Sequence, residues 1–407
     1  MGLKSFSLIL ALQSFSTGIL VAVYSLVFIS RGLDLSQLSI IMGVLSFTVI
    51  LLELPTGIFA DLYGRRFAFI LSICFTFFGT LIVLLSQSFF LLCLSMVLSG
   101  IGRALSSGSL EALYIERFIS HNGRESLPRI LTHLNVLVSS GLAIGATIGG
   151  LMPSFSEQFV LFATPYDLNL MCKLFLSLLI GFLTLLCIKD SFTRESFSTP
   201  ESDLVTHLTS GLTLLRKEKV IVVVLISLFA TGFFFFSLET FWQPQFISIL
   251  PDRQSLWVLS ILSFSYFASA LVGSLIAEKL LCFGKIKAIY LFPIGRMLMA
   301  LLLIFLGHQF QIQSFVIIFS MIYFFLGLSN IPENLLINEV TPDRYRASIL
   351  SLSSLVLQLG VLVASIVSAL IIKHTAVSTL WTVASVLLGL SSLFFLFSTV
   401  NSHRNSK

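Results

Sequence analysis

The stretch Gly57-Ile-Phe-Ala-Asp61-Leu-Tyr-Gly64-Arg65-Arg66 stands between two apolar runs, at 39–60 and 67–87. Each run is close to the roughly 20 apolar residues that a helix needs to cross a bilayer. Gly64 allows a tight reversal of the chain, and Gly57 permits close contact with another helix. Asp61 lies beside the start of the second helix, where an anion is favourable, and the two arginines can pair with it. The stretch predicts a charged clasp between two membrane helices; the alternative is a basic turn that only fixes topology.

The composition indicates a membrane protein. Of 407 residues, 56% are hydrophobic and 11% are charged, with a mean hydropathy of +1.01, whereas a soluble domain carries about 25% charged residues. The net charge of +5 does not indicate a nucleic-acid partner, because the basic residues sit in short loops between apolar runs. The five cysteines form no Cys-x-x-Cys pair, so we expect neither a disulfide framework nor a metal site.

Twelve apolar segments predict an all-α protein with twelve transmembrane helices. The predicted spans are 6–29, 39–60, 67–87, 89–115, 130–153, 169–188, 220–248, 256–277, 288–307, 314–338, 348–372 and 376–399. Twelve spans place both termini on the same side of the membrane. That side holds eighteen basic residues and the other holds three, which are Arg31, Arg253 and Lys373. Because positive charge concentrates in cytoplasmic loops, both termini are expected in the cytoplasm.

A polar stretch at 189–219 divides the chain. It predicts two six-helix halves, 1–188 and 220–400, joined by a cytoplasmic linker and followed by a cytoplasmic tail at 401–407. The halves also echo each other at several positions, which suggests related repeats. The matched segments are Gly57–Asp61 with Ser274–Glu278, Gly145 and Gly149 with Gly360 and Ala364, and Glu111–Glu116 with Asn334–Glu339.

Two motifs resemble those of one transporter family. The stretch 57–66 resembles the G-x-x-x-D-x-x-G-R-R/K signature of the major facilitator superfamily, in its expected place between helices two and three. The run Gly141, Gly145, Gly149 and Gly150 resembles the family's antiporter motif, G-x-x-x-G-P-x-x-G-G, with Ala146 in place of the proline. The resemblance covers essentially the whole chain. It implies two six-helix halves with internal inverted repeats that alternate access to a central site, and it associates the glycine motif with export and with contact between the halves. Generic small-residue packing is the alternative for the glycines.

Two ionisable residues lie inside N-terminal helices. Glu53 in helix two is expensive to bury unless it is protonated, paired or facing water. We interpret it as a proton-coupling carboxyl or as a structural partner of an arginine. Arg103 in helix four resembles the buried arginine of the family's helix-four motif and needs an anionic partner. Glu53 is its first candidate partner, and Glu111 or a substrate carboxylate is the next; a role in coupling or substrate binding competes with a structural one.

Helix seven carries an acid among aromatic residues. Glu239, Trp242 and 233–236 suit a cationic amphiphile, through charge pairing and cation–π contact, although aromatic residues also belt membrane interfaces. Arg296 in helix nine is a candidate opposite number of Glu239. Further candidate cavity residues are Gln13, Tyr24 and Asn135.

The leading hypothesis is proton-coupled export of an amphiphilic small molecule, of the drug-efflux type, with Glu53, Arg103 and Glu239 as coupling candidates. The sequence lacks G-x-x-x-x-G-K-[ST], so we expect a proton gradient rather than ATP, and no cofactor. Alternatives are a dedicated exporter of a secreted metabolite such as a siderophore, and an importer of sugar, peptide or organic acid. We see no catalytic constellation and expect no enzyme. Expected partners are a small-molecule substrate and the lipid bilayer of a bacterial cytoplasmic (inner) membrane, and a monomer is the default for the family.

Overall fold

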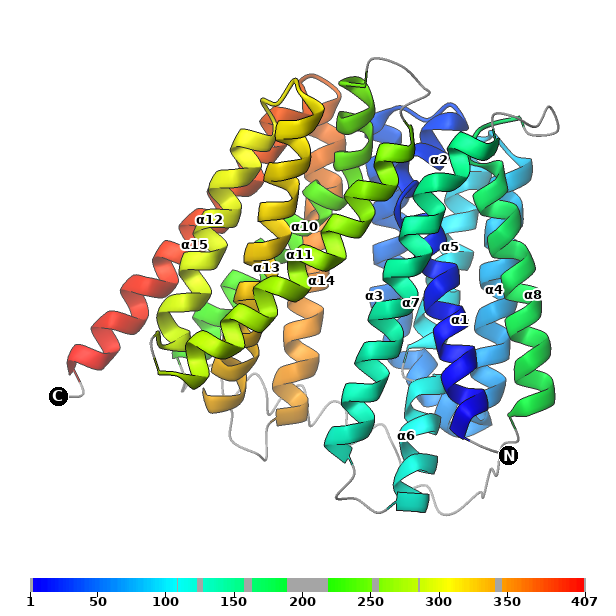
Figure 1. Ribbon diagram of the computed structural model, residues 1–407, viewed down its shortest axis with the longest axis horizontal. Helices are drawn as coiled ribbons and strands as arrows, with labels where there is room; N and C mark the ends of the chain where they lie inside the picture. The colour runs from blue at the N-terminus through cyan, green and yellow to red at the C-terminus, as the bar shows by residue number, and fades with distance from the viewer. Residues whose placement is uncertain are drawn as a thin grey trace. The chain divides into compact units, whose positions relative to one another are not determined.

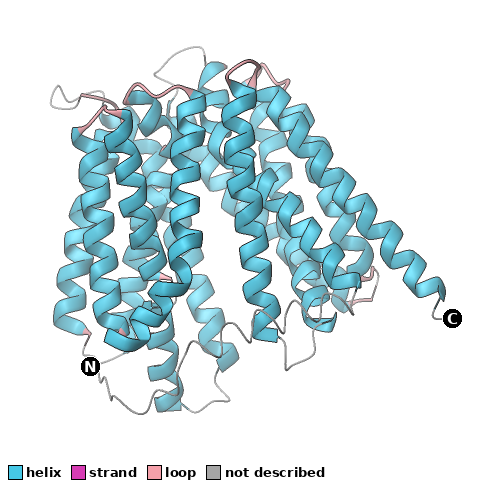
Figure 2. Ribbon diagram, turned by 180° about the vertical axis from the view of Figure 1, so that it is seen from behind, coloured by secondary structure: helices cyan, strands magenta, loops and turns pink. Residues whose placement is uncertain are grey.

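The computed structural model describes residues 3–107, 109–122, 127–156, 163–188, 219–250, 256–284, 286–340 and 346–405. The regular elements in these ranges are helices joined by loops and turns (Figure 2). In chain order they are α1 (Leu3–Val21), α2 (Tyr24–Ser30), α3 (Leu35–Tyr63), α4 (Arg65–Leu85), α5 (Phe89–Ser106), α6 (Ser109–Asn122), α7 (Leu127–Ser156), α8 (Asp167–Cys187), α10 (Lys219–Ser248), α11 (Val258–Cys282), α12 (Ala288–Leu306), α13 (Ile312–Val340), α14 (Arg346–Ile372) and α15 (Val377–Asn405) (Figure 1).

The helices have the length and composition of membrane spans. Within the described ranges, eleven of them are long and apolar enough to cross a bilayer, and α1 with α2 makes a twelfth if that bent pair is one span. The prediction of an all-helical membrane protein is therefore confirmed. The first predicted span differs in detail, because the chain bends by 53° between Val21 and Tyr24. There the Val23 amide donates to the Leu20 carbonyl, a tighter bond than the α-helical one.

The chain separates into two compact units. Unit 1 comprises Met1–Glu195 and Pro251–Phe264, and unit 2 comprises Ser196–Leu250 and Ser265–Lys407. Except for Lys219, the predicted linker 189–219 lies outside the described residues, as do the last two residues of the predicted tail.

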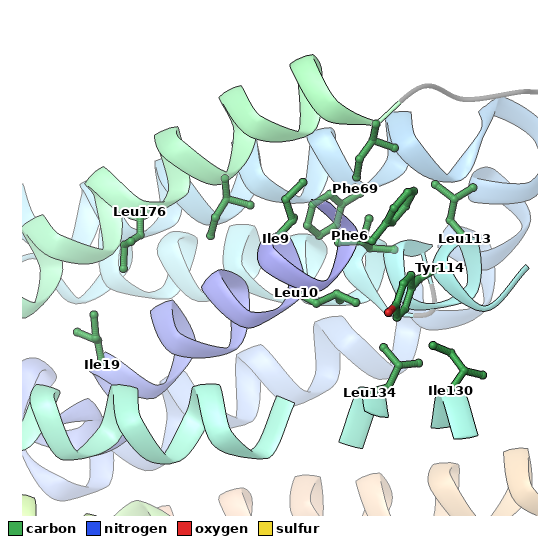
Figure 3. Packing of buried hydrophobic residues seen from close by; sticks show 13 residues of the cluster. Phe6, Ile9, Leu10, Ile19, Phe69, Leu113, Tyr114, Ile130, Leu134 and Leu176 are labelled. Atoms are coloured by element: carbon green, nitrogen blue, oxygen red, sulfur yellow. The ribbon is translucent and has the colours of Figure 1, made fainter. Parts of the chain in front are cut away.

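The core of unit 1 forms where α1 meets its neighbours. Phe6 and Leu10 of α1 lie beside Tyr114 of α6 and Leu134 of α7 (Figure 3). The Phe6 and Tyr114 rings stack with their centroids 5.8 Å apart, and the Tyr114 hydroxyl is 2.9 Å from the Ser7 hydroxyl. This apolar packing fixes α1 against the helix that carries the glycine motif.

Glycines allow α1 and α7 to cross at close range. A methyl group on Gly145 would overlap the Phe15 carbonyl, and one on Gly18 would overlap the Leu142 carbonyl. Unit 2 repeats this crossing between α10 and α14, where Gly360 meets the Phe229 carbonyl and Gly232 meets the Leu357 carbonyl. Gly360 follows Gly145 by 215 residues, the offset that the sequence comparison uses. The repeated glycines therefore serve the same contact in each unit.

Candidate functional site

The loop between α3 and α4 has the predicted reversal at Gly64. This residue has φ 96° and ψ 136°, and its amide donates to the Ala60 carbonyl, which ends α3. A positive φ strains any residue with a side chain, so the position requires glycine. The prediction for Gly64 is confirmed at the level of the backbone.

In the described ranges, the other residues of the 57–66 motif do not show the contacts that the sequence predicts for them. A methyl group on Gly57 would meet nothing within 4 Å among the described residues, so the close helix contact expected at Gly57 is not seen in this part of the chain. Arg66 donates through Nη2 to the Leu185 carbonyl of α8 at 2.8 Å, and Arg65 also has a partner. Asp61 belongs to α3, but its side chain lies outside what the structure describes. Arg66 thus joins the start of α4 to the end of α8.

The glycine motif of α7 faces mainly α1. Methyl groups on Gly141, Gly145 and Gly149 would overlap Ala11, Phe15 and Ile19 of that helix, whereas one on Gly150 would overlap Ser260 at the start of α11. The Ser260 hydroxyl donates to the Thr147 carbonyl at 2.7 Å. Three of the four glycines therefore pack on α1 rather than on the C-terminal half, and Gly150 packs on α11; all four contacts lie within unit 1, which includes Ser260.

Glu53 and Arg103 do not meet. Among the described residues, the ion pairs include neither of these side chains, and Glu53 is half-buried while Arg103 is exposed. Gly100 packs on Thr48 of α3 and Gly102 on Thr76 of α4, so Arg103 projects from a helix clamped on two sides. Tyr24 lies within electrostatic range of the guanidinium. The described residues therefore show no Glu53–Arg103 pair, and the neighbour that Arg103 acts on electrostatically is the phenol of Tyr24.

The three remaining polar candidates of unit 1 have different surroundings. Gln13 of α1 donates through Nε2 to the Ser106 hydroxyl at 2.8 Å, which joins α1 to the end of α5. The Tyr24 hydroxyl lies 3.6 Å from the Met96 Sδ and can donate to it. Asn135 of α7 is exposed. Gln13 and Tyr24 therefore bridge helices, whereas the side chain of Asn135 is accessible to solvent.

The most developed polar cluster surrounds Glu239 of α10 in unit 2. The Tyr323 hydroxyl of α13 donates to Glu239 Oε1 at 2.5 Å, and the Tyr266 hydroxyl of α11 is a second partner of the carboxylate. The two tyrosine rings lie 4.0 Å apart, centroid to centroid. Three helices therefore converge on one carboxylate, and we call Glu239, Tyr266 and Tyr323 the tyrosine–carboxylate cluster.

Aromatic packing supports this cluster from one side. Trp242 lies one turn after Glu239, is 3% exposed, and has its ring 5.0 Å from the ring of Phe319. Phe319 in turn lies 4.9 Å from the Tyr323 ring. Trp242 was predicted as a cavity residue, and the structure instead buries it against α13. The rings of Trp242 and Phe319 thus form a continuous aromatic contact with Tyr323, which binds Glu239.

Arg296 does not pair with Glu239. Its Nη2 bonds to Oε2 of Glu333 on α13, within unit 2. Arg296 is 1% exposed, and its guanidinium carbon lies 5.7 Å from the centre of the Phe292 ring. Sequence reasoning missed Glu333, although an acid after Pro332 inside an apolar span is itself a signal of function or pairing.

A second buried ion pair lies in unit 1. Arg31 Nη2 donates to Asp167 Oδ1 at 2.6 Å, and both residues are almost fully buried. Asp167 also accepts from the Thr164 amide and hydroxyl. The sequence assigns Arg31 to an outer loop and gives it no partner. The pair joins the end of α2 to the start of α8, and its several hydrogen bonds indicate a structural role.

This combination defines a class of protein. Eleven to twelve apolar helices in repeated units, with carboxylates and guanidinium groups inside the spans, are typical of a membrane transporter. In the described residues, no group of three or more His, Cys, Asp or Glu side chains could hold a metal ion.

Comparison with known proteins identifies the family. The model of the Major Facilitator Superfamily matches residues 6–365, so the chain belongs to this superfamily: it is a multi-pass transporter of small molecules and not an enzyme. It is 21% identical over 381 residues to the uncharacterized MFS-type transporter YxaM of Bacillus subtilis (strain 168), with 93% of this chain and 91% of that protein covered.

Solved structures have the same fold. A crystal structure of the nucleoside transporter NupG aligns with a TM-score of 0.77 at 15% identity, covering 97% of this chain and 98% of that one. A POT family transporter in complex with a thioalcohol-conjugated peptide aligns with a TM-score of 0.73 at 17% identity, covering 98% and 96%. A bacterial homolog of the human lysosomal transporter Spinster gives 0.70 at 14%, covering 97% and 95%.

Proposed function

We propose that this transporter exports an amphiphilic small molecule in exchange for protons. It works by alternating access, as a monomer in the cytoplasmic (inner) membrane of a bacterium, with both termini in the cytoplasm. The proton gradient supplies the energy. The observation that carries the proposal is the tyrosine–carboxylate cluster, which holds a carboxylate inside a membrane helix next to packed aromatic rings.

Charge neutrality explains how one carboxylate can exchange two ions. In the described part of the chain, Glu239 takes part in neither ion pair. A carboxyl away from bulk water becomes neutral by binding a proton or by accepting a cation. Tyrosine hydroxyls can donate to the carboxylate and accept from the carboxylic acid, so Tyr266 and Tyr323 fit both states. Competition between a proton and a cationic cargo for Glu239 then produces antiport.

Two further features support this reading. The glycine motif of α7 resembles the antiporter motif, which favours export. The aromatic residues beside Glu239 favour a cargo that combines a cationic group with apolar surface, because ring faces attract cations. Glu53 remains an alternative proton carrier, since it is half-buried in α3.

The test uses purified protein in liposomes that contain a pH-sensitive dye. A panel of cationic dyes, antibiotics and metal chelators is added under an imposed pH gradient. We expect substrate-dependent proton flux in the wild type and a loss of at least tenfold in Glu239→Gln. Glu278→Gln is the matched control, because it neutralises an exposed carboxylate on α11. Full flux in Glu239→Gln together with loss in Glu53→Gln would move the proton site to Glu53; full flux in both variants would refute a carboxylate exchange site in these helices.

A further inference from the structure

The Arg296–Glu333 pair is incompletely satisfied. Nη2 of Arg296 bonds to Glu333, but Nε and Nη1 are buried and have no hydrogen-bond partner among the described residues. Glu333 likewise accepts a hydrogen bond from Arg296 alone within the described part of the chain. Buried donors without acceptors are costly and rare. The guanidinium therefore carries spare donors on a side that the carboxylate does not use.

The other buried ion pair gives an internal comparison. Asp167 accepts from Arg31 and also from the Thr164 amide and hydroxyl, so its oxygens have three donors. Arg31 keeps one buried nitrogen without a partner, against two for Arg296. The Arg31–Asp167 pair behaves as a structural link between helices. Arg296 therefore has more buried N–H donors without an acceptor than Arg31, and these donors could bind an additional acceptor.

The helix packing holds Arg296 in place. Gly295 lets α13 approach so closely that a methyl group there would overlap the Ser329 hydroxyl, and Glu333 follows Ser329 by one turn. Phe292, one turn before Arg296, belongs to an apolar cluster with Leu336 and Phe395. The side chain of Glu333 is 12% exposed against 2% for that of Arg296. Glu333 is therefore the more accessible member of the pair.

We propose that Arg296 is an anion-binding residue that takes a carboxylate group borne on a short apolar chain. A carboxylate matches the fork of guanidinium donors, and the apolar cluster suits the chain attached to it. A single negative charge fits this setting better than a phosphate, because each additional buried charge needs its own partner. The proposal does not depend on the cargo, direction or coupling ion proposed above.

Charge balance makes the binding sensitive to pH. The pair is neutral as it stands, and a ligand carboxylate adds one negative charge. A proton that arrives with the ligand and rests on Glu333 restores neutrality. The other ionisable groups on these two helices and on the helices packed against them are Tyr290 on α12, Tyr323 and Glu339 on α13, Lys219 and Glu239 on α10, and Tyr266, Glu278, Lys279 and Cys282 on α11, with none between Val377 and Ser402 on α15. Glu333 is thus the acid that contacts the guanidinium.

The experiment measures binding of octanoate to the purified full-length protein by calorimetry, with octanol and octylammonium as neutral and cationic probes of equal length. We expect saturable binding of octanoate alone, stronger at pH 5.5 than at pH 7.5. Arg296→Gln should weaken it at least tenfold, and Lys279→Gln, which removes an exposed cation at the end of α11, should leave it unchanged. Equal binding by octanol, or unchanged octanoate binding in Arg296→Gln, overturns the proposal.

A second variant keeps the test decisive if Arg296→Gln does not fold. Glu333→Gln removes the competing charge, so it should bind octanoate at least threefold more tightly and lose most of the pH dependence; weaker or equally pH-dependent binding contradicts the proposal. Counterflow of labelled octanoate in liposomes then separates two sources of the ligand. Transport of labelled octanoate would identify the carboxylate as part of a cargo. Binding of octanoate that inhibits transport, without movement of octanoate itself, would identify a resident fatty acid. Either outcome is consistent with an anion site at Arg296.

Discussion

At the scale of single residues, two glycines of one loop motif should respond to substitution with opposite signs. Gly64 has a positive φ, so Gly64→Ala places a side chain in a strained backbone and should cost about 1–2 kcal/mol. Gly57 lies inside α3 with open space around it. Gly57→Ala should therefore stabilise the helix by about 0.5–1 kcal/mol.

The measurement is thermal unfolding of the purified variants in detergent. The two substitutions are chemically identical and seven residues apart, so each is the other's control. A gain in stability for Gly64→Ala would show that the reversal tolerates another conformation. Loss of transport in a well-folded Gly57→Ala would instead indicate that Gly57 meets a partner in another state of the transport cycle.

The sequence could identify single charged residues but not their partners. Glu239 stands out because an acid inside an apolar run is expensive, and its aromatic neighbours are visible in the same helix. Its actual partners, Tyr266 and Tyr323, come from two other helices. Pairing depends on helix rotation and depth, which periodicity fixes only within one helix. For the same reason Arg296 could be predicted as a site residue while Glu333 could not be chosen as its partner.

At the scale of helices, the repeated crossings predict matched damage in the two units. Gly145→Ala and Gly360→Ala each drive a methyl group into a backbone carbonyl of the crossing helix. Overpacking of this kind costs about 1–3 kcal/mol, and backbone cannot move aside as a flexible side chain can. We expect both variants to lose thermal stability by similar amounts, because the two contacts are equivalent.

Gly181→Ala is the matched control for this pair. Gly181 also lies inside a membrane helix, but a methyl group there would be 3.7 Å from the nearest atom, Ile73 Cγ2. It should be neutral or slightly stabilising. Unfolding curves of the three variants, collected in one detergent, decide the matter. A loss of stability confined to Gly145→Ala would mean that the two crossings do not contribute equally to stability.

Helix existence was predictable because span length and hydropathy are properties of single segments. The break between α1 and α2 was not, since neither proline nor glycine occupies positions 21–24. For the glycine motif, the close helix contact could be predicted, but the partner helix of each glycine could not. Spacing of four residues indicates a close helix contact, but three glycines meet α1 and one meets α11 because they point in different directions around α7.

At the scale of the whole molecule, the distribution of basic residues predicts orientation in the membrane. Eighteen basic residues lie on the side of the termini and three on the other, so the positive-inside rule places the α11–α12 loop in the cytoplasm and the α12–α13 loop outside. Cys282, at the end of α11, is exposed beside the first loop. His308 lies in the second loop, directly after α12.

These two positions test the orientation with one reagent. A variant that keeps Cys282 as its single cysteine should react with a membrane-impermeant maleimide only after the cells are permeabilised. A cysteine-free variant with His308→Cys should react in intact cells, because its loop faces outward. The two sites flank the same helix, so reactivity must alternate between them if α12 crosses the membrane. The reverse pattern would place the termini outside and contradict the predicted orientation, while labelling of both sites in intact cells would show that α12 does not span the bilayer.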